Sequence, residues 1–163
     1  DARIHTTRGG MAVDNFLVQD PLGRPFSEDS QLARIETTIA EALGGKIKLV
    51  PQLAARPSAR PRADAFDVRP GVEFDNAASN RFTVIEVNAR DRPALLNRLA
   101  RALFEAKLMV HSAHIATYGE RAVDTFYVTD LLGEKVDSAT RLKAVEKKLL
   151  EAAEEQTVEV AAA

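Results

Sequence analysis

The hydrophobic and polar positions of this chain follow one pattern twice. Residues 12–23 read AVDNFLVQDPLG and residues 122–133 read AVDTFYVTDLLG, so eight of twelve positions are identical. After each segment, apolar residues recur at steps of three or four, which is the spacing of one face of a helix. These apolar residues are Leu32, Ile35, Ile39 and Leu43 in the first copy and Leu142, Val145 and Leu149 in the second. Each copy therefore predicts a strand followed by a helix.

The repeat also extends backwards into a preceding strand. The matching residues are Ala2, Ile4 and Thr6 in the first copy and Ala113, Ile115 and Thr117 in the second. Glycines lie between the two strands of each copy, at 9–10 and at 119, and glycine tolerates the positive φ that tight turns need. We therefore expect two antiparallel hairpins. In the second one, Phe126 and Val128 alternate with polar neighbours, so one face is apolar and needs the following helix as a cover.

Two more elements precede the second hairpin. Residues 82–88 read FTVIEVN, an apolar run typical of a central strand that is buried on both faces. A helix is predicted to open at residues 91–93, with Pro93 in its first turn, where the missing N–H costs nothing. Its buried stripe is expected to comprise Leu96, Leu99, Leu103 and Ala106. A short alternating run at residues 157–160 is fit to be a closing strand.

Together these elements predict an α+β fold of the ferredoxin-like βαββαβ type, in tandem, with both helices on one face of the sheet. The second domain is expected to be complete over residues 80–161. The first copy, over 1–76, is expected to be truncated at its N-terminus and to consist of a hairpin, a helix, a linker excursion over 44–66 and a closing strand at about 68–76. Residues 46–50 are the alternative for that strand. The chain starts at Asp1 without a methionine, in mid-strand, so we expect a fragment of a larger protein.

Composition narrows the class of protein. The chain has 163 residues, of which 45% are hydrophobic and 28% charged, so it is able to bury a core. With 22 basic and 24 acidic residues the net charge is −2, and we expect neither nucleic-acid nor membrane binding. Arginines at 56, 60, 62 and 69 are interpreted as part of a solvated linker rather than as a nucleic-acid site. The absence of cysteine fits a reducing, cytoplasmic location.

Catalytic chemistry is not evident in the sequence. No phosphate-binding glycine loop, nucleophile or acid–base pair is recognisable, and no cofactor or metal is expected. His111 and His114 are three apart on a predicted strand, so they are expected to point to opposite faces and not to share a metal. Asp14 and Asp124 recur at equivalent positions of the repeat. We interpret them as structural acids near turns, on strands at the edge of the sheet.

One junction does favour ligand binding, namely residues 88–95, where the central strand passes into the helix. Backbone N–H groups near Ala94 and Leu95, with the positive end of the helix dipole, favour a carboxylate such as that of an amino acid. Asp91 either caps the helix or faces the ligand's ammonium group, and both interpretations stay open. Asn88 offers a donor and an acceptor for a side-chain amide.

The order of elements and the RDRPALL junction at residues 90–96 resemble the ACT family of small-molecule sensing domains. More closely, the chain resembles the C-terminal end of the family of bifunctional uridylyltransferase/uridylyl-removing enzymes, which modify the nitrogen-signalling PII protein. The segments that carry this resemblance are FTVIEV at 82–87, DRPALL at 91–96 and ERAVDTFYVTD at 120–130. With the tandem repeat, they cover most of residues 1–155.

The resemblance implies tandem ACT domains that sense glutamine and signal to catalytic domains elsewhere in a parent chain, which would itself be the enzyme. It places the ligand against the strand-to-helix loop and beneath strand residues of a neighbouring ACT domain. Many members have glycine where this chain has Ala94, whose methyl group narrows the approach to the backbone. The ligand-binding residues carried over in this way are Asn88, Ala89, Asp91, Arg92, Pro93, Ala94, Leu95, His111, Ser112 and Ala113.

The predicted function is therefore regulatory amino-acid sensing by a non-catalytic region that forms homodimers through its ACT domains. The parent enzyme would act on PII and control nitrogen assimilation. One alternative is a constitutive interaction module that binds no metabolite. A small enzyme of ferredoxin-like fold is a second alternative, and the missing catalytic groups disfavour it.

Overall fold

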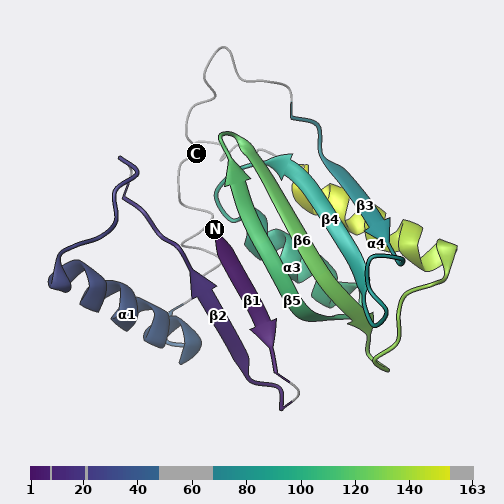
Figure 1. Cartoon of the computed structure of the whole chain (residues 1–163), viewed down its shortest axis with the longest axis horizontal. Coiled ribbons are helices and arrows are strands. Elements are labelled where there is room, and N and C mark those ends of the chain that lie inside the picture. The colour runs from purple at the N-terminus through teal and green to yellow at the C-terminus, as the bar shows by residue number, and fades with distance from the viewer. Residues whose placement is uncertain (8, 21, 48–67, 155–163) are drawn as a thin grey trace, which may run out of the picture.

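A computed structural model describes residues 1–7, 9–20, 22–47 and 68–154 (Figure 1). Its strands form one six-stranded antiparallel sheet in the order β2-β1-β5-β6-β4-β3. The strands are β1 (Ala2–Thr6), β2 (Ala12–Phe16), β3 (Gly71–Asp75), β4 (Thr83–Arg90), β5 (Leu108–Tyr118) and β6 (Arg121–Asp130). The helices described are α1 (Asp29–Leu43), α3 (Leu95–Glu105) and α4 (Ala139–Ala153).

The second repeat has the predicted α+β fold. Helices α3 and α4 lie together on one face of the sheet, behind it in Figure 1, and pack against each other. Apolar side chains of both helices and of the inner face of β4, β5 and β6 belong to one core. Its fully buried side chains include Ile85, Leu99, Leu103, Val128 and Leu149. The predicted closing strand at 157–160 lies outside the described residues.

Strand β4 is central to its part of the sheet, as its apolar run predicted, but its outer neighbour is β3. We expected a strand at about 68–76 to close a sheet of the first repeat, and this pairing is wrong. β3 lies at the opposite edge from β2 because a short turn joins it to β4, and Phe74 pairs with Ile85. The turn is fixed by the Thr83 hydroxyl, which donates to Asn76 Oδ1 (2.7 Å) and accepts from the Val136 N–H (2.9 Å). The alternative at 46–50 lies largely outside the described residues, and the domain boundaries stay predictions.

The two copies of the hairpin lie side by side through their first strands. β1 pairs antiparallel with β5, with Ala2 opposite Ile115 and Ile4 opposite Ala113. Because Ala2 and Ile4 are the repeat counterparts of Ala113 and Ile115, the pairing is related by a local two-fold axis at the Arg3–His114 pair. The sheet of the second repeat thus continues into the first.

The loops after the hairpins also share one geometry. Asp20 Oδ1 accepts hydrogen bonds from the N–H groups of Leu22 (2.8 Å) and Arg24 (2.9 Å). Asp130 Oδ1 does the same for Leu132 (2.8 Å) and Glu134 (3.0 Å). Both loops then reach a glycine with positive φ, at 23 and 133, where other residues would be strained. These backbone N–H donors hold the pKa of each aspartate below its usual value.

We expected helix α1 to cover the apolar face of its hairpin, but it does not. The helix has no buried residue, and its apolar side chains Leu32, Ile39 and Leu43 are exposed. Its counterpart α4 packs on α3, β3 and β4 rather than on the hairpin, and the described residues contain no counterpart of α3 and β4 in the first repeat. None of the helices described is long and apolar enough to cross a bilayer.

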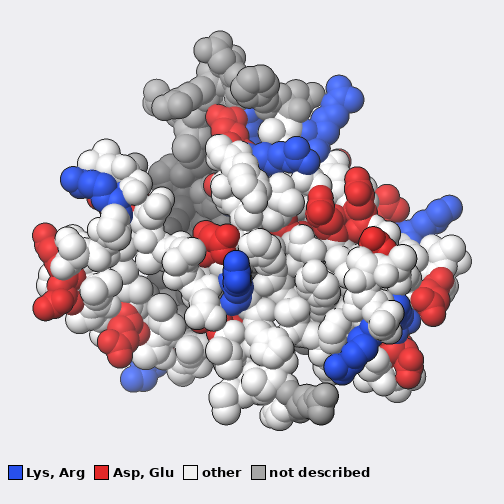
Figure 2. Space-filling view, in the orientation of Figure 1, with Lys and Arg blue, Asp and Glu red and all other residues white. Residues whose placement is uncertain are grey.

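The face of the sheet without helices points toward the viewer in Figure 2. Its middle is largely uncharged, whereas acidic side chains gather over β3 and β4. Glu73 of β3 and Glu86 of β4 are cross-strand partners. Like charges directly opposite each other repel, so this pair disfavours the pairing of β3 with β4.

Candidate functional site

A pocket of about 600 Å³ lies on the inner face of the sheet, beside α3. It is bounded by the loop between β4 and α3, one side of α3, the inner faces of β5 and β6, and Ile4 of β1. Most of its lining is apolar, and its charged side chains are Asp91, Arg92 and Asp124. The other lining residues are Ala94, Leu95, Leu96, Asn97, Ala100, Leu103, Val110, Ala113, Ile115, Thr117, Ala122 and Phe126.

The N-terminus of α3 forms one wall of this pocket. The helix begins at Leu95, and Ala94 at the N-cap adopts a left-handed conformation with φ of 65° and no side-chain cap. Pro93 therefore precedes the helix instead of standing in its first turn, and the interpretation of Asp91 as a helix cap is wrong. Within the part of the chain described, the N–H groups of Leu96 and Asn97 donate no hydrogen bond. Together with the helix dipole, such N–H groups favour an anion.

The left-handed conformation at Ala94 gives a testable prediction. In the left-handed region, alanine is less stable than glycine by roughly 1 kcal/mol. Ala94→Gly should therefore raise the free energy of unfolding by up to about 1 kcal/mol, measured by urea denaturation. The matched control Ala100→Gly, inside the same helix, should lower it by about 1 kcal/mol. A loss of stability in both variants would contradict the positive φ of Ala94.

Asp124 is the buried charge of the pocket. It lies on β6 between Ala122 and Phe126 on the inner face and is only 2% exposed. Burial, and secondly the carboxylate of Asp91, raise the pKa of Asp124 to about 6, while the nearby backbone N–H of Ala116 acts in the opposite direction. Its Oδ1 atom is buried and has no hydrogen-bond partner among the residues that the structure describes. Our interpretation of Asp124 as a structural acid near a turn, on an edge strand, is therefore wrong, because β6 is flanked by β5 and β4.

The structure brings only some of the predicted ligand residues to this pocket. Those that line it are Asp91, Arg92, Ala94, Leu95 and Ala113. Ala89 is buried in the core instead. Asn88 lies on the opposite face, where its Oδ1 accepts from Arg121 (2.6 Å) and its Nδ2 donates to Glu86 (2.9 Å). Its amide is thus engaged by protein groups and faces away from the pocket.

The histidines of β5 do not lie as expected either. A bulge between Val110 and Ser112 leaves His111 without a cross-strand partner. Its Nε2 lies 2.9 Å from the Thr129 hydroxyl and its ring packs on Phe82, on the face away from the pocket. Burial there lowers the pKa of His111.

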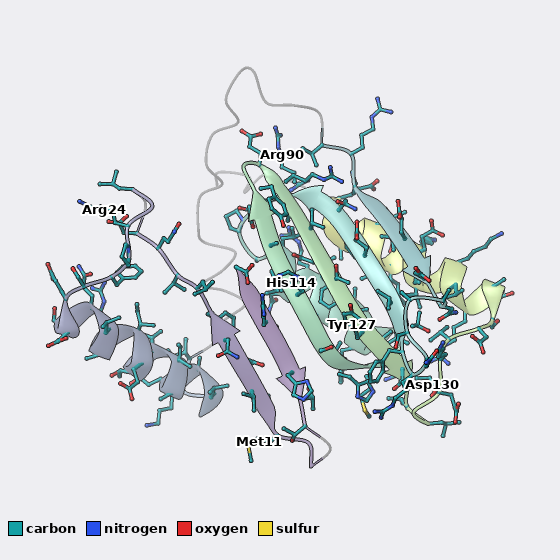
Figure 3. The ribbon with its side chains drawn as sticks, viewed as in Figure 1. Met11, Arg24, Arg90, His114, Tyr127 and Asp130 are labelled. Atoms are coloured by element: carbon teal, nitrogen blue, oxygen red, sulfur yellow. The ribbon has the colours of Figure 1, made fainter. Side chains whose placement is uncertain are left out.

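His114 lies on that same outer face, labelled in Figure 3, with Nε2 3.4 Å from Asp1. The expectation of opposite faces fails because a bulge shifts the alternation of a strand by one residue. Ser112 pairs with Tyr127, which also lies on this outer face, so neither His111 nor Ser112 lines the pocket. Across the described residues, no three histidine or acidic side chains come together to hold a metal ion.

Several pocket residues were missed by the sequence reasoning, and Asp124 and Ile4 are the most informative of them. The signal for Asp124 was present, because it stands two and four residues before Phe126 and Val128 and so shares their inner face. On the inner face of a strand, an acidic side chain is shielded from water, unlike one at the edge of the sheet. Ile4 gave no local signal, since it reaches the pocket only through the pairing of β1 with β5.

Residues 78–156 match the profile described as the ACR family N-terminal ACT domain. That range contains β4, α3, β5, β6 and α4, and with them nearly every residue of the pocket. No solved structure matches the chain.

The relatives of the chain include proteins named bifunctional uridylyltransferase/uridylyl-removing enzyme. The chain is 79% identical to that of Novosphingobium aromaticivorans over 162 residues, which are 99% of this chain and 18% of the relative. Identity to the Erythrobacter litoralis protein is 65% over 94% of the chain and 17% of the relative. For the Zymomonas mobilis protein it is 56%, again over 94% and 17%. The chain thus spans less than a fifth of the length of the relatives that it matches.

Proposed function

Because residues 78–156 belong to the ACT-domain family, we propose that the pocket between α3 and the inner face of β5 and β6 binds a free amino acid, with L-glutamine as the first candidate. One observation supports this most directly. The pocket combines a helix N-terminus with available N–H groups and two carboxylates on an otherwise mostly apolar wall. An amino acid carries the two complementary groups, a carboxylate and an ammonium, next to each other.

The proposed role is regulatory. A ligand shifts an equilibrium only by its differential affinity for two arrangements. Ile4 of the first repeat forms part of the pocket wall, so a ligand in the second repeat would bind better to the arrangement in which β1 pairs with β5. We propose that the chain passes this preference to catalytic domains of a larger uridylyltransferase/uridylyl-removing enzyme that acts on PII in the cytoplasm.

Self-association is part of the same proposal. The hairpin and helix of the first repeat expose large apolar side chains, which monomeric proteins rarely group together. Those on β2 and α1 include Val13, Phe16, Leu32, Ile39 and Leu43. We propose that a second copy covers this surface. The alternative function, an interaction module without a metabolite, is favoured by the same surface and differs only in having no use for the pocket.

Calorimetric titration with L-glutamine tests the sensor function. We expect saturable binding to the whole chain, weakened about tenfold by Asp91→Ala, since a charge-assisted hydrogen bond contributes on the order of 1.5–3 kcal/mol. Asp29→Ala is the matched control, because Asp29 is an exposed aspartate in the first turn of α1 and does not line the pocket. Its binding should equal that of the unmodified chain.

The interaction module makes the opposite prediction. If none of the twenty amino acids gives heat with the unmodified chain, the sensor function is wrong. Self-association without amino-acid binding, seen by sedimentation, would then favour the interaction module.

A further inference from the structure

One oxygen of the buried Asp124 carboxylate lacks a hydrogen-bond partner among the described residues. The residue is only 2% exposed, the oxygen without a partner in the described part of the chain is Oδ1, and the residue lines the pocket. A buried ionised group is strongly disfavoured unless it is paired and hydrogen-bonded. Asp14 shows that the repeat itself does not impose this burial, because this counterpart of Asp124 on β2 is exposed.

The surroundings of Asp124 are suited to a cation. Asp91, from the loop between β4 and α3, adds a second negative charge near it. Apolar side chains of Leu103, Ile115 and Phe126 line the same pocket, so electrostatic attraction there is stronger than in water. Arg92 is the only positively charged residue among the lining residues described, and it follows Asp91 in the loop at the start of α3.

We infer that Asp124, assisted by Asp91, is the binding site for the primary ammonium group of the ligand, and that it selects ligands that carry this group. The inference rests on the proposed function and refines it. The carboxylate of the ligand would then lie toward Arg92 and the N–H groups of Leu96 and Asn97. Asp124 would thus determine specificity, whereas the apolar lining would accommodate the rest of the ligand.

This role makes binding depend on pH. Asp124 has a pKa of about 6, raised by burial and by Asp91, and it must lose its proton before it pairs with an ammonium group. Below that pKa, affinity should therefore fall by about tenfold for each pH unit. The other charged groups facing it are Asp91 and Arg92, since the residues of β1, β5 and α3 that line the pocket are not titratable.

The test compares two ligands and three forms of the whole chain by calorimetry. The ligands are L-glutamine and 4-carbamoylbutanoate, which is glutamine without its ammonium group. At pH 7.5 the unmodified chain should bind glutamine at least about tenfold more tightly than the analogue, because a charge-assisted contact is lost. Asp124→Asn should lose this preference, and Asp14→Asn, the counterpart in the repeat, should keep it. At pH 5.0 glutamine should bind the unmodified chain about tenfold more weakly, and Asp124→Asn should show no such change.

The outcomes separate the two proposals. Glutamine binding that Asp124→Asn leaves intact, or that is equal at pH 5.0 and 7.5, would overturn the role of Asp124 while amino-acid sensing stands. A failure of the unmodified chain to bind any amino acid would overturn both. Asp124→Asn is expected to remain folded, because it removes a buried charge, and a thermal denaturation curve of the same sample checks this.

Discussion

Replacing Leu99 by alanine should lower the free energy of unfolding by about 3–5 kcal/mol, because large-to-small changes in a packed core cost that much. Leu99 is fully buried, at the point where α3 meets the sheet and α4. Domains of this size are stable by only about 5–15 kcal/mol, so the variant should unfold at a much lower urea concentration. Urea denaturation at pH 7.5, followed by circular dichroism, measures the difference.

Phe104→Ala is the matched control for this experiment. Phe104 lies in the same helix but is 74% exposed, with Lys107 Nζ 5.7 Å from the centre of its ring. Its loss should cost less than about 1 kcal/mol, since exposed contacts of this kind are weak. Equal losses in the two variants would contradict the described rotation of α3. The pocket would then lose the wall that this helix provides.

Local patterns in the sequence were sufficient for most of the second repeat. Alternating residues in β6 placed Phe126 and Val128 in the core, and the spacing of Leu99 and Leu103 placed the inner face of α3. These signals are local, because the side-chain period of an element is set by its own backbone. The pairing partner of an edge strand, in contrast, is not determined by local sequence. The alternation of side chains in β3 is compatible with either edge of the sheet. Only the turn with Asn76 and Thr83 determines that β3 pairs with β4.

The candidate site could be predicted only where it depends on local sequence. The loop from Asp91 to Leu95 follows from the order of the elements, and it does line the pocket. Of the three residues carried over on β5, only Ala113 lines the pocket. Because of a single bulge at His111, this residue and Ser112 both lie on the outer face. No residue type in the segment predicts a bulge. The burial of Asp124 also follows from the alternation of side chains along β6. It could be predicted only with the knowledge that β6 has a neighbouring strand on both sides.

Asp124→Asn should raise the free energy of unfolding at pH 7.5 by about 1–3 kcal/mol. The pKa of Asp124 is raised from 3.8 to about 6 in the folded chain, and each unit of difference between the folded and unfolded states corresponds to about 1.4 kcal/mol. The folded state therefore prefers the protonated acid. This preference contributes fully below the unfolded pKa and is lost as pH rises through 6. Above pH 6 the ionised side chain is a net cost to folding.

The sign and the pH window both follow from that order of pKa values. The difference between Asp124→Asn and the unmodified chain should be largest above pH 7 and should approach zero near pH 4, where the acid is neutral in the folded state. Asp14→Asn, at the exposed counterpart, should change stability by less than about 0.5 kcal/mol at either pH. Urea denaturation of the three forms at both pH values is the measurement. A less stable Asp124→Asn at pH 7.5 would mean that protein groups already offset the buried charge, and the pocket would then have no need of a cationic ligand.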